Sequence, residues 1–382
     1  MIQFKVTAPA KVILYGEHAV VHGRTAIAAS LGLHTTIEFS ELLELEGVVK
    51  IFFPKINLAI NVSLQQIENF MLASKAQGII ENLDTFYNAI KEFVNTIGYN
   101  SAHQKLSLEV FFYLLIYIMC KENGKVRPFQ INLSTEVSIS SGLGSSASFA
   151  VSLAACFLHW SHLQNDIYKP FDSHDLGTIS KYAFNGEVIM HGTPSGLDNS
   201  VCTYGSIIEY RKGESVKLIA GVQSMKVLLV DTRVSRSTKS LVDNLMELKR
   251  TYPVITDFIF DAIDTISRTA LKEMQKIKDL PESDNESLIK GYKQLMTLIN
   301  MNQGLLTTLQ ASHPSLDRIC AQAQNYGLAA KLTGAGGGGY AYILLLPDTQ
   351  PETISSISRK LIADGYIVSL TSLGCPGVQI HD

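Results

Sequence analysis

The segment Gly142-Leu143-Gly144-Ser145-Ser146-Ala147 decides how this chain is interpreted. It follows a β-rich stretch at residues 128–134 and runs directly into an apolar helical stretch at residues 149–160, which predicts the order strand, glycine loop, helix. Glycines permit positive φ angles and the close approach of an anion, and the first turn of a helix presents unpaired N–H groups. The segment, called the GLGSS loop below, therefore predicts a phosphate-binding loop. An ordinary glycine turn with a serine N-cap is the simpler alternative.

Three charged side chains are candidates for the chemistry beside such a loop. Lys11 lies between apolar residues of a predicted N-terminal strand. If it is buried it requires a carboxylate or phosphate partner, and the alternative is that it faces solvent. Glu187 lies in a predicted helix at residues 175–190, and Asp198 follows a Gly/Pro-rich turn at residues 191–196. Two such carboxylates suit phosphoryl transfer, which needs a Mg²⁺ ligand and often a proton acceptor, although isolated acids are usually solvated.

A second glycine-rich run, Gly334-Ala335-Gly336-Gly337-Gly338-Gly339, lies between an apolar stretch at residues 328–331 and a strong predicted strand at residues 340–346. Ordering so many glycines has a high entropic cost, so we expect the backbone to pass close to another group there. A flexible linker is the alternative, but linkers seldom lie inside such a unit. Residues 334–339 are called the C-terminal glycine loop below.

Length and composition predict two domains with well-developed cores, because 46% of the 382 residues are hydrophobic and 18% are charged. The net charge of −3 gives no basic field for nucleic acid or anionic lipid, and the longest apolar run, at residues 110–120, is too short to span a bilayer. Neither nucleic acid nor a membrane is therefore expected as a partner. The five cysteines are scattered without a CxxC pair, and the N-terminus has a strand pattern rather than that of a signal peptide, which predicts a cytoplasmic protein.

The remaining pattern mixes strands and helices without strict alternation, which favours an α+β class over a doubly wound parallel sheet. A hairpin is predicted from residues 47–53 and 57–62, turned at Pro54, and Lys212-Gly213-Glu214 marks a predicted boundary between domains 1–213 and 214–382. Other predicted elements are strands at residues 4–7, 11–14, 35–39, 205–210, 225–230 and 366–370, and helical segments at residues 64–120 and 351–363.

Taken together and in this order, these segments resemble the motifs of the galacto-, homoserine, mevalonate and phosphomevalonate (GHMP) kinase superfamily. That superfamily has an N-terminal strand and loop, a Gly-Leu-Gly-Ser-Ser loop and a C-terminal glycine loop. Within it the segments are most similar to the mevalonate kinases, over nearly the whole chain. Besides the GLGSS loop, the likeness is carried by Ala8-Pro9-Ala10-Lys11-Val12-Ile13-Leu14-Tyr15-Gly16-Glu17-His18-Ala19-Val20-Val21-His22-Gly23, His191-Gly192-Thr193-Pro194-Ser195-Gly196-Leu197-Asp198-Asn199 and Lys331-Leu332-Thr333-Gly334-Ala335-Gly336-Gly337-Gly338-Gly339.

The resemblance implies a fold and an activity. The implied fold is a two-domain GHMP kinase fold of the α+β class, with an N-terminal domain like ribosomal protein S5 domain 2, a C-terminal ferredoxin-like α/β sandwich, and the active site in the cleft between them. The implied activity is transfer of phosphate from ATP, with Mg²⁺, to the hydroxyl of mevalonate, a step toward isoprenoids and sterols. Members of the family are often homodimers, so a homodimer is expected.

Carried over residue by residue, the resemblance assigns roles in the site. Ser146 and Glu187 would hold Mg²⁺. Asp198 would accept the hydroxyl proton, as a true base or as an electrostatic aid, while Lys11 beside it would steady charge at the reacting oxygen. ATP would be bound by Ser141, Gly142, Leu143, Gly144, Ser145, Ser146 and Ala147, together with Gly334 and Gly336 of the C-terminal glycine loop. Mevalonate would be bound by Lys11, Glu17, His18, Asp198 and Thr232.

Other interpretations stay open at this point. Phosphomevalonate kinase is the nearest, because Arg24 and Arg233 offer positive charge for a substrate phosphate. Residues 137–141 lack the proline and the Gly-Ala pair usual in the family, so nucleotide contacts there are expected to differ, and residues 53–62 are expected to contribute to the adenine pocket. A non-catalytic metabolite sensor of the same fold is the alternative from another class, but such a relative is expected to have lost one of the three charged candidates.

Overall fold

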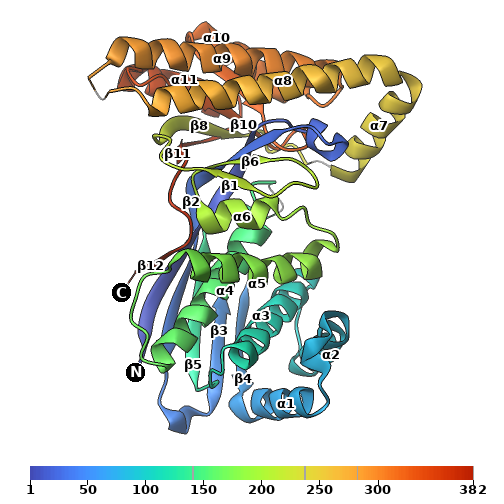
Figure 1. Ribbon diagram of the computed structural model, residues 1–382, viewed down its shortest axis with the longest axis vertical. Coiled ribbons are helices and arrows are strands. Elements are labelled where there is room, and N and C mark those ends of the chain that lie inside the picture. Colours follow the sequence, from blue (N-terminus) through green and yellow to red (C-terminus); the bar gives the residue numbers. More distant parts are fainter. Residues whose placement is uncertain (140–141, 236–237, 282, 382) are drawn as a thin grey trace.

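The computed structural model describes residues 1–139, 142–235, 238–281 and 283–381, so the predicted ATP-binding residue Ser141 lies outside the described residues. The described strands form a 12-stranded sheet in which β3 and β5 are parallel neighbours and the other pairs are antiparallel (Figure 1). One path through it runs β4-β3-β5-β2-β11-β8-β10-β9. The strands are β1 (Gln3–Tyr15), β2 (Ala26–Glu41), β3 (Val48–Phe53), β4 (Leu58–Ser63), β5 (Phe129–Thr135), β6 (Ile207–Tyr210), β7 (Lys217–Ile219), β8 (Met225–Asp231), β9 (Ala329–Leu332), β10 (Tyr340–Leu344), β11 (Ile367–Leu373) and β12 (Gln379–His381).

Helices gather at both ends of the elongated molecule (Figure 1). One group, α1 to α5, lies with strands β3 to β5, and the other, α7 to α11, lies with strands β8 to β11, while α6 lies between them. The helices are α1 (Leu64–Ala76), α2 (Leu83–Ile97), α3 (Ala102–Lys121), α4 (Ser145–Gln164), α5 (Ser173–His191), α6 (Leu197–Tyr204), α7 (Thr238–Thr251), α8 (Pro253–Lys278), α9 (Asn285–Thr308), α10 (Pro314–Asn325) and α11 (Pro351–Ala363). Among the described residues, no helix combines the length and hydrophobicity needed to cross a membrane.

Local sequence signals account for many of these boundaries. Pro253, Pro314 and Pro351 are the first residues of α8, α10 and α11, where the fixed φ of proline suits a helix and its missing N–H is not needed. The predicted hairpin is confirmed as β3 and β4, joined by a short 3-10 turn over Pro54–Ile56. The predicted helix at residues 351–363 is also confirmed.

Other elements differ from the prediction. The two strands expected at residues 4–7 and 11–14 are one strand, β1, whose pairing register shifts between Pro9 and Ala10, because proline lacks the N–H that a regular ladder needs. Helix α6 was not predicted, since its sequence is short and follows a Gly/Pro-rich turn. The apolar stretch at residues 328–331, for which no strand was predicted, forms most of β9.

The C-terminal strands have the order β11-β8-β10-β9, with helices α7 to α10 between β8 and β9 and α11 between β10 and β11. This arrangement is the ferredoxin-like topology that the resemblance implied. It confirms the predicted α+β class and the predicted ferredoxin-like topology for the C-terminal half of the chain.

Strands β1 and β2 join the two halves of the molecule. Val12 and Leu31 belong to the same hydrophobic core as C-terminal residues such as Val227 and Ile343. The C-terminal strand β12 pairs with β1, and Leu31 of β2 pairs with Leu373 of β11. The sheet is therefore continuous from one half to the other, and the boundary between 1–213 and 214–382 stays a prediction.

Candidate active site

The GLGSS loop is held against strand β1 by backbone contacts. Gly142 and Gly144 have φ angles of 79° and 73°, and α4 begins directly afterwards at Ser145. The Lys11 N–H donates to the Leu143 carbonyl at 2.9 Å. A Cβ on Gly144 would come within 2.6 Å of the Lys11 Cγ, so only glycine fits without displacing the lysine. The start of α4 and the Lys11 side chain are therefore neighbours.

Lys11 has the carboxylate partner that its burial requires. It is 7% exposed, and its Nζ lies 3.1 Å from Oδ1 of Asp198. Asp198 lies in the first turn of α6, which begins after Gly196 in a left-handed conformation. The Asp198 side chain keeps 33% of its surface exposed, so it is accessible to a ligand while paired. The two residues predicted to be catalytic are therefore adjacent, and their roles stay predictions.

Glu187 of α5 is a buried acid in the same region, with 3% of its surface exposed. Burial raises the pKa of its carboxyl to about 7, and the charge of Asp198 acts in the same direction. The hydroxyl of Ser146 and the ammonium of Lys11 lower the pKa of Glu187 and offset part of this rise. Oε1 of Glu187 has no hydrogen-bond partner among the described residues. A partnerless carboxylate oxygen beside a serine hydroxyl is a donor set that fits a hard cation such as Mg²⁺.

His191 also belongs to this region, although it was not among the predicted site residues. Its Nε2 lies 3.0 Å from Oγ of Ser146. It follows Glu187 by four residues at the end of α5, a spacing that places both side chains on one face of the helix. That spacing was the signal in the sequence, where residue 191 was interpreted only as the start of a turn.

A cavity of about 470 Å³ is lined both by residues of the GLGSS loop and by the Lys11–Asp198 pair. Its volume lies in the usual range of small-molecule sites. The rest of its wall includes apolar side chains, among them Phe53 and Ile56 beside the β3–β4 turn and Leu106 of α3. Of the stretch 53–62, Phe53, Lys55 and Ile56 thus line the cavity, whereas the contribution of α3 had no counterpart in the sequence analysis.

A smaller cavity of about 270 Å³ adjoins the first, because His191 and Asp198 line both. Ser146 lines the larger cavity and Glu187 lines the smaller one. The two predicted metal ligands therefore approach each other where the cavities meet.

The C-terminal glycine loop is shaped by close packing. A Cβ on Gly336 would come within 1.9 Å of the Ala311 carbonyl oxygen, and one on Gly338 would come within 2.8 Å of the Val234 side chain. Just before the loop, the Thr333 hydroxyl donates to the Ile13 carbonyl at 2.9 Å and accepts from the Ile13 N–H at 3.1 Å. The expected close approach is confirmed, and it is an approach to protein groups, while Thr333 ties the residues before the loop to β1. Binding of ATP by Gly334 and Gly336 stays a prediction.

Three predicted mevalonate-binding residues have protein partners and do not line the larger cavity. Glu17 is enclosed and forms an ion pair with Lys331. Nε2 of His18 lies 2.8 Å from the Ala335 carbonyl oxygen. The Thr232 hydroxyl donates to the Gly339 carbonyl at 2.8 Å. The structure thus brings Lys11, Ser146 and Asp198 together in one cavity, with Glu187 adjoining it.

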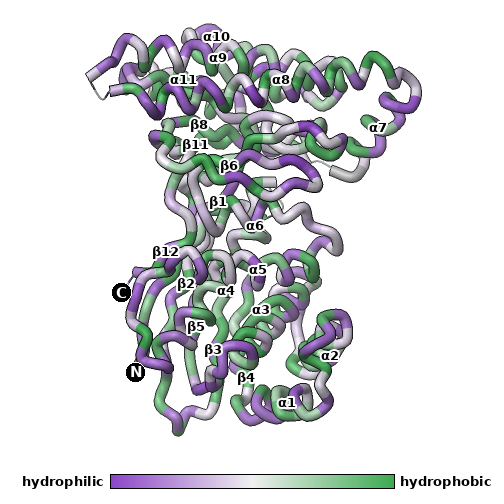
Figure 2. Tube along the Cα trace, viewed as in Figure 1, coloured by the Kyte–Doolittle hydropathy of each residue, from purple (hydrophilic) through white to green (hydrophobic). Residues whose placement is uncertain are grey.

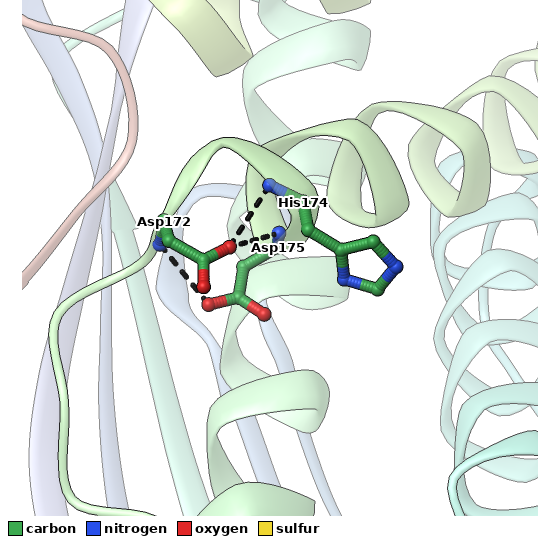
Figure 3. Close-up of side chains that lie close together, drawn as sticks. All are labelled: Asp172, His174 and Asp175. Carbon is green, nitrogen blue, oxygen red and sulfur yellow. Dashed lines mark hydrogen bonds between the residues drawn. The ribbon is translucent and has the colours of Figure 1, made fainter.

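A separate group of potential metal ligands, Asp172, His174 and Asp175, lies at the start of α5 (Figure 3). Asp172 accepts hydrogen bonds from the backbone N–H groups of the other two residues, and Asp175 accepts one from the Asp172 N–H (Figure 3). Lys169 contacts both carboxylates. These bonds form a capping box that satisfies the helix terminus, so the group is explained without a metal.

Known proteins share both the sequence and the fold. Residues 111–206 match the model of the GHMP kinases N terminal domain, and residues 280–364 match that of the GHMP kinases C terminal domain. The mevalonate kinase of Homo sapiens is 32% identical over 98% of this chain and 94% of its own length, and that of Bos taurus is 34% identical over the same shares.

Solved structures give the same result. The Methanococcus jannaschii mevalonate kinase has a TM-score of 0.70 and 26% identity, covering 97% of this chain and 98% of its own. The L. major mevalonate kinase, solved in complex with R-mevalonate, shares the fold with a TM-score of 0.67 and 23% identity over 98% of this chain and 96% of its own. The resemblance inferred from the three motifs is thereby confirmed: the chain belongs to the mevalonate kinase family of GHMP kinases.

Proposed function

We propose that this protein transfers the γ-phosphate of ATP to the 5-hydroxyl of (R)-mevalonate, giving 5-phosphomevalonate and ADP in the pathway to isoprenoid and sterol precursors. Family membership supports this reaction. The observation that carries it is the Lys11–Asp198 pair beside the GLGSS loop in one cavity.

The cavity offers different surroundings to the two ends of ATP. Apolar side chains such as Phe53 and Ile56 suit the adenine ring. The first turn of α4, at Ser145 and Ser146, presents N–H groups that have no carbonyl partner within the helix, and these suit the phosphates. The C-terminal glycine loop supports this cradle indirectly, because Thr333 holds β1 at Ile13 and β1 in turn holds the GLGSS loop.

We assign Mg²⁺ binding to Ser146 and Glu187. The metal, when bound, neutralises charge on the phosphate oxygens. The partnerless Oε1 of Glu187 supports this assignment, since a buried carboxylate oxygen otherwise loses its solvation without compensation. His191 orients the Ser146 hydroxyl through their 3.0 Å contact.

Lys11 and Asp198 act on the reacting hydroxyl. Phosphoryl transfer depends mainly on positioning and electrostatic stabilisation. The Asp198 carboxylate orients the alcohol and accepts its proton, and the ammonium of Lys11, 3.1 Å away, stabilises the negative charge that remains nearby. His18 and Thr232 are proposed to border the mevalonate side, whereas the Glu17 carboxylate is enclosed.

A phosphomevalonate kinase is the second candidate, but one observation disfavours it. Arg24 is one of the two arginines considered for binding a substrate phosphate. Its guanidinium donates hydrogen bonds to Asp261 at 2.7 Å and to the His22 carbonyl at 3.0 Å. Its guanidinium is therefore already engaged.

Purified protein incubated with Mg²⁺-ATP and each acceptor tests the function. We expect ADP release with (R)-mevalonate, and none above background with phosphomevalonate, galactose or homoserine. The Asp198→Asn variant, which retains the shape of the site, serves as the control for contaminating kinases. Phosphorylation of phosphomevalonate but not of mevalonate would reverse the assignment, and ATP binding with no turnover of any acceptor would favour a sensor.

We further propose that the protein is a homodimer. Hydrophobic residues occur at the end of α8 next to α7 (Figure 2). Val254, Ile255 and Phe258, in the first two turns of α8, are exposed, the last with 71% of its surface. Exposed groups of this kind mark interaction surfaces. Light scattering should give twice the mass of the chain, and a Phe258→Glu variant should give the mass of one chain. A monomeric wild-type protein at micromolar concentration would contradict the proposal.

A cytoplasmic location is part of the proposal. All five cysteines are free thiols, and Cys156, Cys202 and Cys320 are buried, as suits a reducing compartment. Fractionation of producing cells tests the location, and recovery of the protein with membranes or in the medium would contradict it.

A further inference from the structure

A fully buried ion pair lies outside the reacting centre. The side chains of Glu17 and Lys331 are both 0% exposed, and the Lys331 Nζ contacts Oε1 of Glu17. The ammonium also donates to the Leu332 carbonyl at 2.7 Å and lies 5.5 Å from the centre of the Tyr342 ring. The second Glu17 oxygen accepts a hydrogen bond from Nδ2 of Asn302 at 3.1 Å. Both charges are thus well partnered, and neither faces solvent.

Such a pair is poorly explained by stability alone. Removing two charges from water is costly, and an apolar pair of similar volume is often as stable or more so. The interior around Glu17 and Lys331 is otherwise suited to apolar residues, because β9 and β10 are buried along their whole length. A role in fixing the position of a neighbouring segment therefore explains the buried pair better than stability does.

The pair belongs to a row of contacts between two distant segments. Residues 13–18, at the end of β1 and beyond, lie against residues 331–335 through Ile13–Thr333, Glu17–Lys331 and His18–Ala335. His18 has a φ of 61°, an uncommon conformation for a residue other than glycine, which neighbouring contacts must maintain. Asn302 anchors the row to α9.

The row acts on the same strand that carries Lys11. Strand β1 ends at Tyr15, two residues before Glu17, and Lys11 lies four residues before that end. Loss of the ion pair between Glu17 and Lys331 would release the segment that follows β1. Neither Glu17 nor Lys331 lines the larger cavity.

We propose that Lys331 is a positioning residue for phosphoryl transfer: it holds the Glu17 carboxylate and thereby fixes residues 13–18 on the acceptor side of the site, so that Lys331 acts through Glu17, and Glu17 does not contact mevalonate. This inference rests on the proposed function, and it replaces the substrate-binding role expected for Glu17.

A double-mutant cycle with Glu17→Gln, Lys331→Met and the double variant tests it. Lys331→Met leaves a buried carboxylate unpaired, so we expect kcat/KM for mevalonate to fall by about tenfold or more while the Kd for ATP changes less than about twofold. In the double variant the unpaired charge is absent, so we expect most of the lost thermal stability to return, whereas kcat/KM should stay low because the ion pair that fixes residues 13–18 is missing. Lys121→Met, which breaks the exposed Lys121–Glu81 pair, is the matched control and should change neither quantity.

The outcomes separate the explanations. If Glu17 contacts mevalonate, Glu17→Gln raises KM for mevalonate while Lys331→Met, which keeps Glu17, does not, and this result overturns the proposal. A double variant that regains both thermal stability and kcat/KM also overturns it, because the ion pair would then be dispensable. If Lys331→Met lowers stability but leaves KM and kcat unchanged, the pair is structural only and the proposal is also overturned. If Lys331→Met fails to fold, the double variant separates a structural from a positioning role: low kcat/KM at restored thermal stability supports the proposal, and kcat/KM equal to that of the wild type overturns it. A wild-type protein that binds ATP but does not phosphorylate mevalonate refutes the proposed function instead, while coupling in thermal unfolding still reports on the pair.

Discussion

Glu187→Gln should stabilise the metal-free protein at alkaline pH and at the same time remove its response to Mg²⁺. The wild-type carboxyl has its pKa raised from 4.5 to about 7, first by burial and then by the charge of Asp198. A group whose folded-state pKa is raised binds its proton more tightly when folded. The contribution of Glu187 to the free energy of unfolding therefore falls as pH rises from about 4.5 to 7, by about 3 kcal/mol when complete.

Glutamine removes this loss because it has no ionised form. We expect Glu187→Gln to match the wild type near pH 4.5 and to exceed it by about 3 kcal/mol at pH 8, in urea unfolding measured with EDTA and without nucleotide. Adding Mg²⁺-ATP should reverse the order, since only the wild type keeps the metal ligand and gains stability from binding. Glu81→Gln, whose side chain is 75% exposed, is the control and should show neither effect.

Two results would refute this reasoning. A stability difference between Glu187→Gln and wild type that does not vary with pH would show that burial does not perturb the carboxyl. An equal stabilisation of both proteins by Mg²⁺-ATP would remove Glu187 from the metal site.

Further predictions concern other parts of the site. Asp198→Asn should lower turnover roughly 10²- to 10⁴-fold while ATP still binds, as measured by calorimetry, and near-normal turnover would remove Asp198 from its role. Lys11→Met should reduce kcat while the melting temperature stays close to that of the wild type, because methionine fills the space of the aliphatic stem and the partly exposed Asp198 can be solvated; a fall in melting temperature with unchanged kcat would contradict this. Gly144→Ala should cost about 1–3 kcal/mol in urea unfolding, from its positive φ and the contact with Lys11, and should weaken ATP binding. His191→Ala should raise the Mg²⁺ concentration needed for half-maximal rate, with little effect on KM for mevalonate; an unchanged Mg²⁺ dependence would exclude a role through Ser146.

Elements governed by neighbours in sequence were predictable. The β3–β4 hairpin follows from two apolar runs around a proline turn, and α11 follows from proline at its first position and apolar residues at helical spacing. The GLGSS loop was identified because glycine conformation and helix start are local properties. The burial of Lys11 between apolar strand residues was foreseen as a possibility, and with it the need for a carboxylate.

The sequence by itself determined the family and the α+β class, and it supplied most of the residues proposed for the chemistry, because each depends on residue types at short spacing. Only the tertiary structure decided which groups meet. It placed Glu17 against Lys331, 314 residues away, and packed the C-terminal glycine loop on Ala311, and it brought α3 to the wall of the larger cavity. These contacts depend on how the helix and sheet layers pack and on which opposite charge comes close to a buried charge. Short sequence patterns do not contain that information.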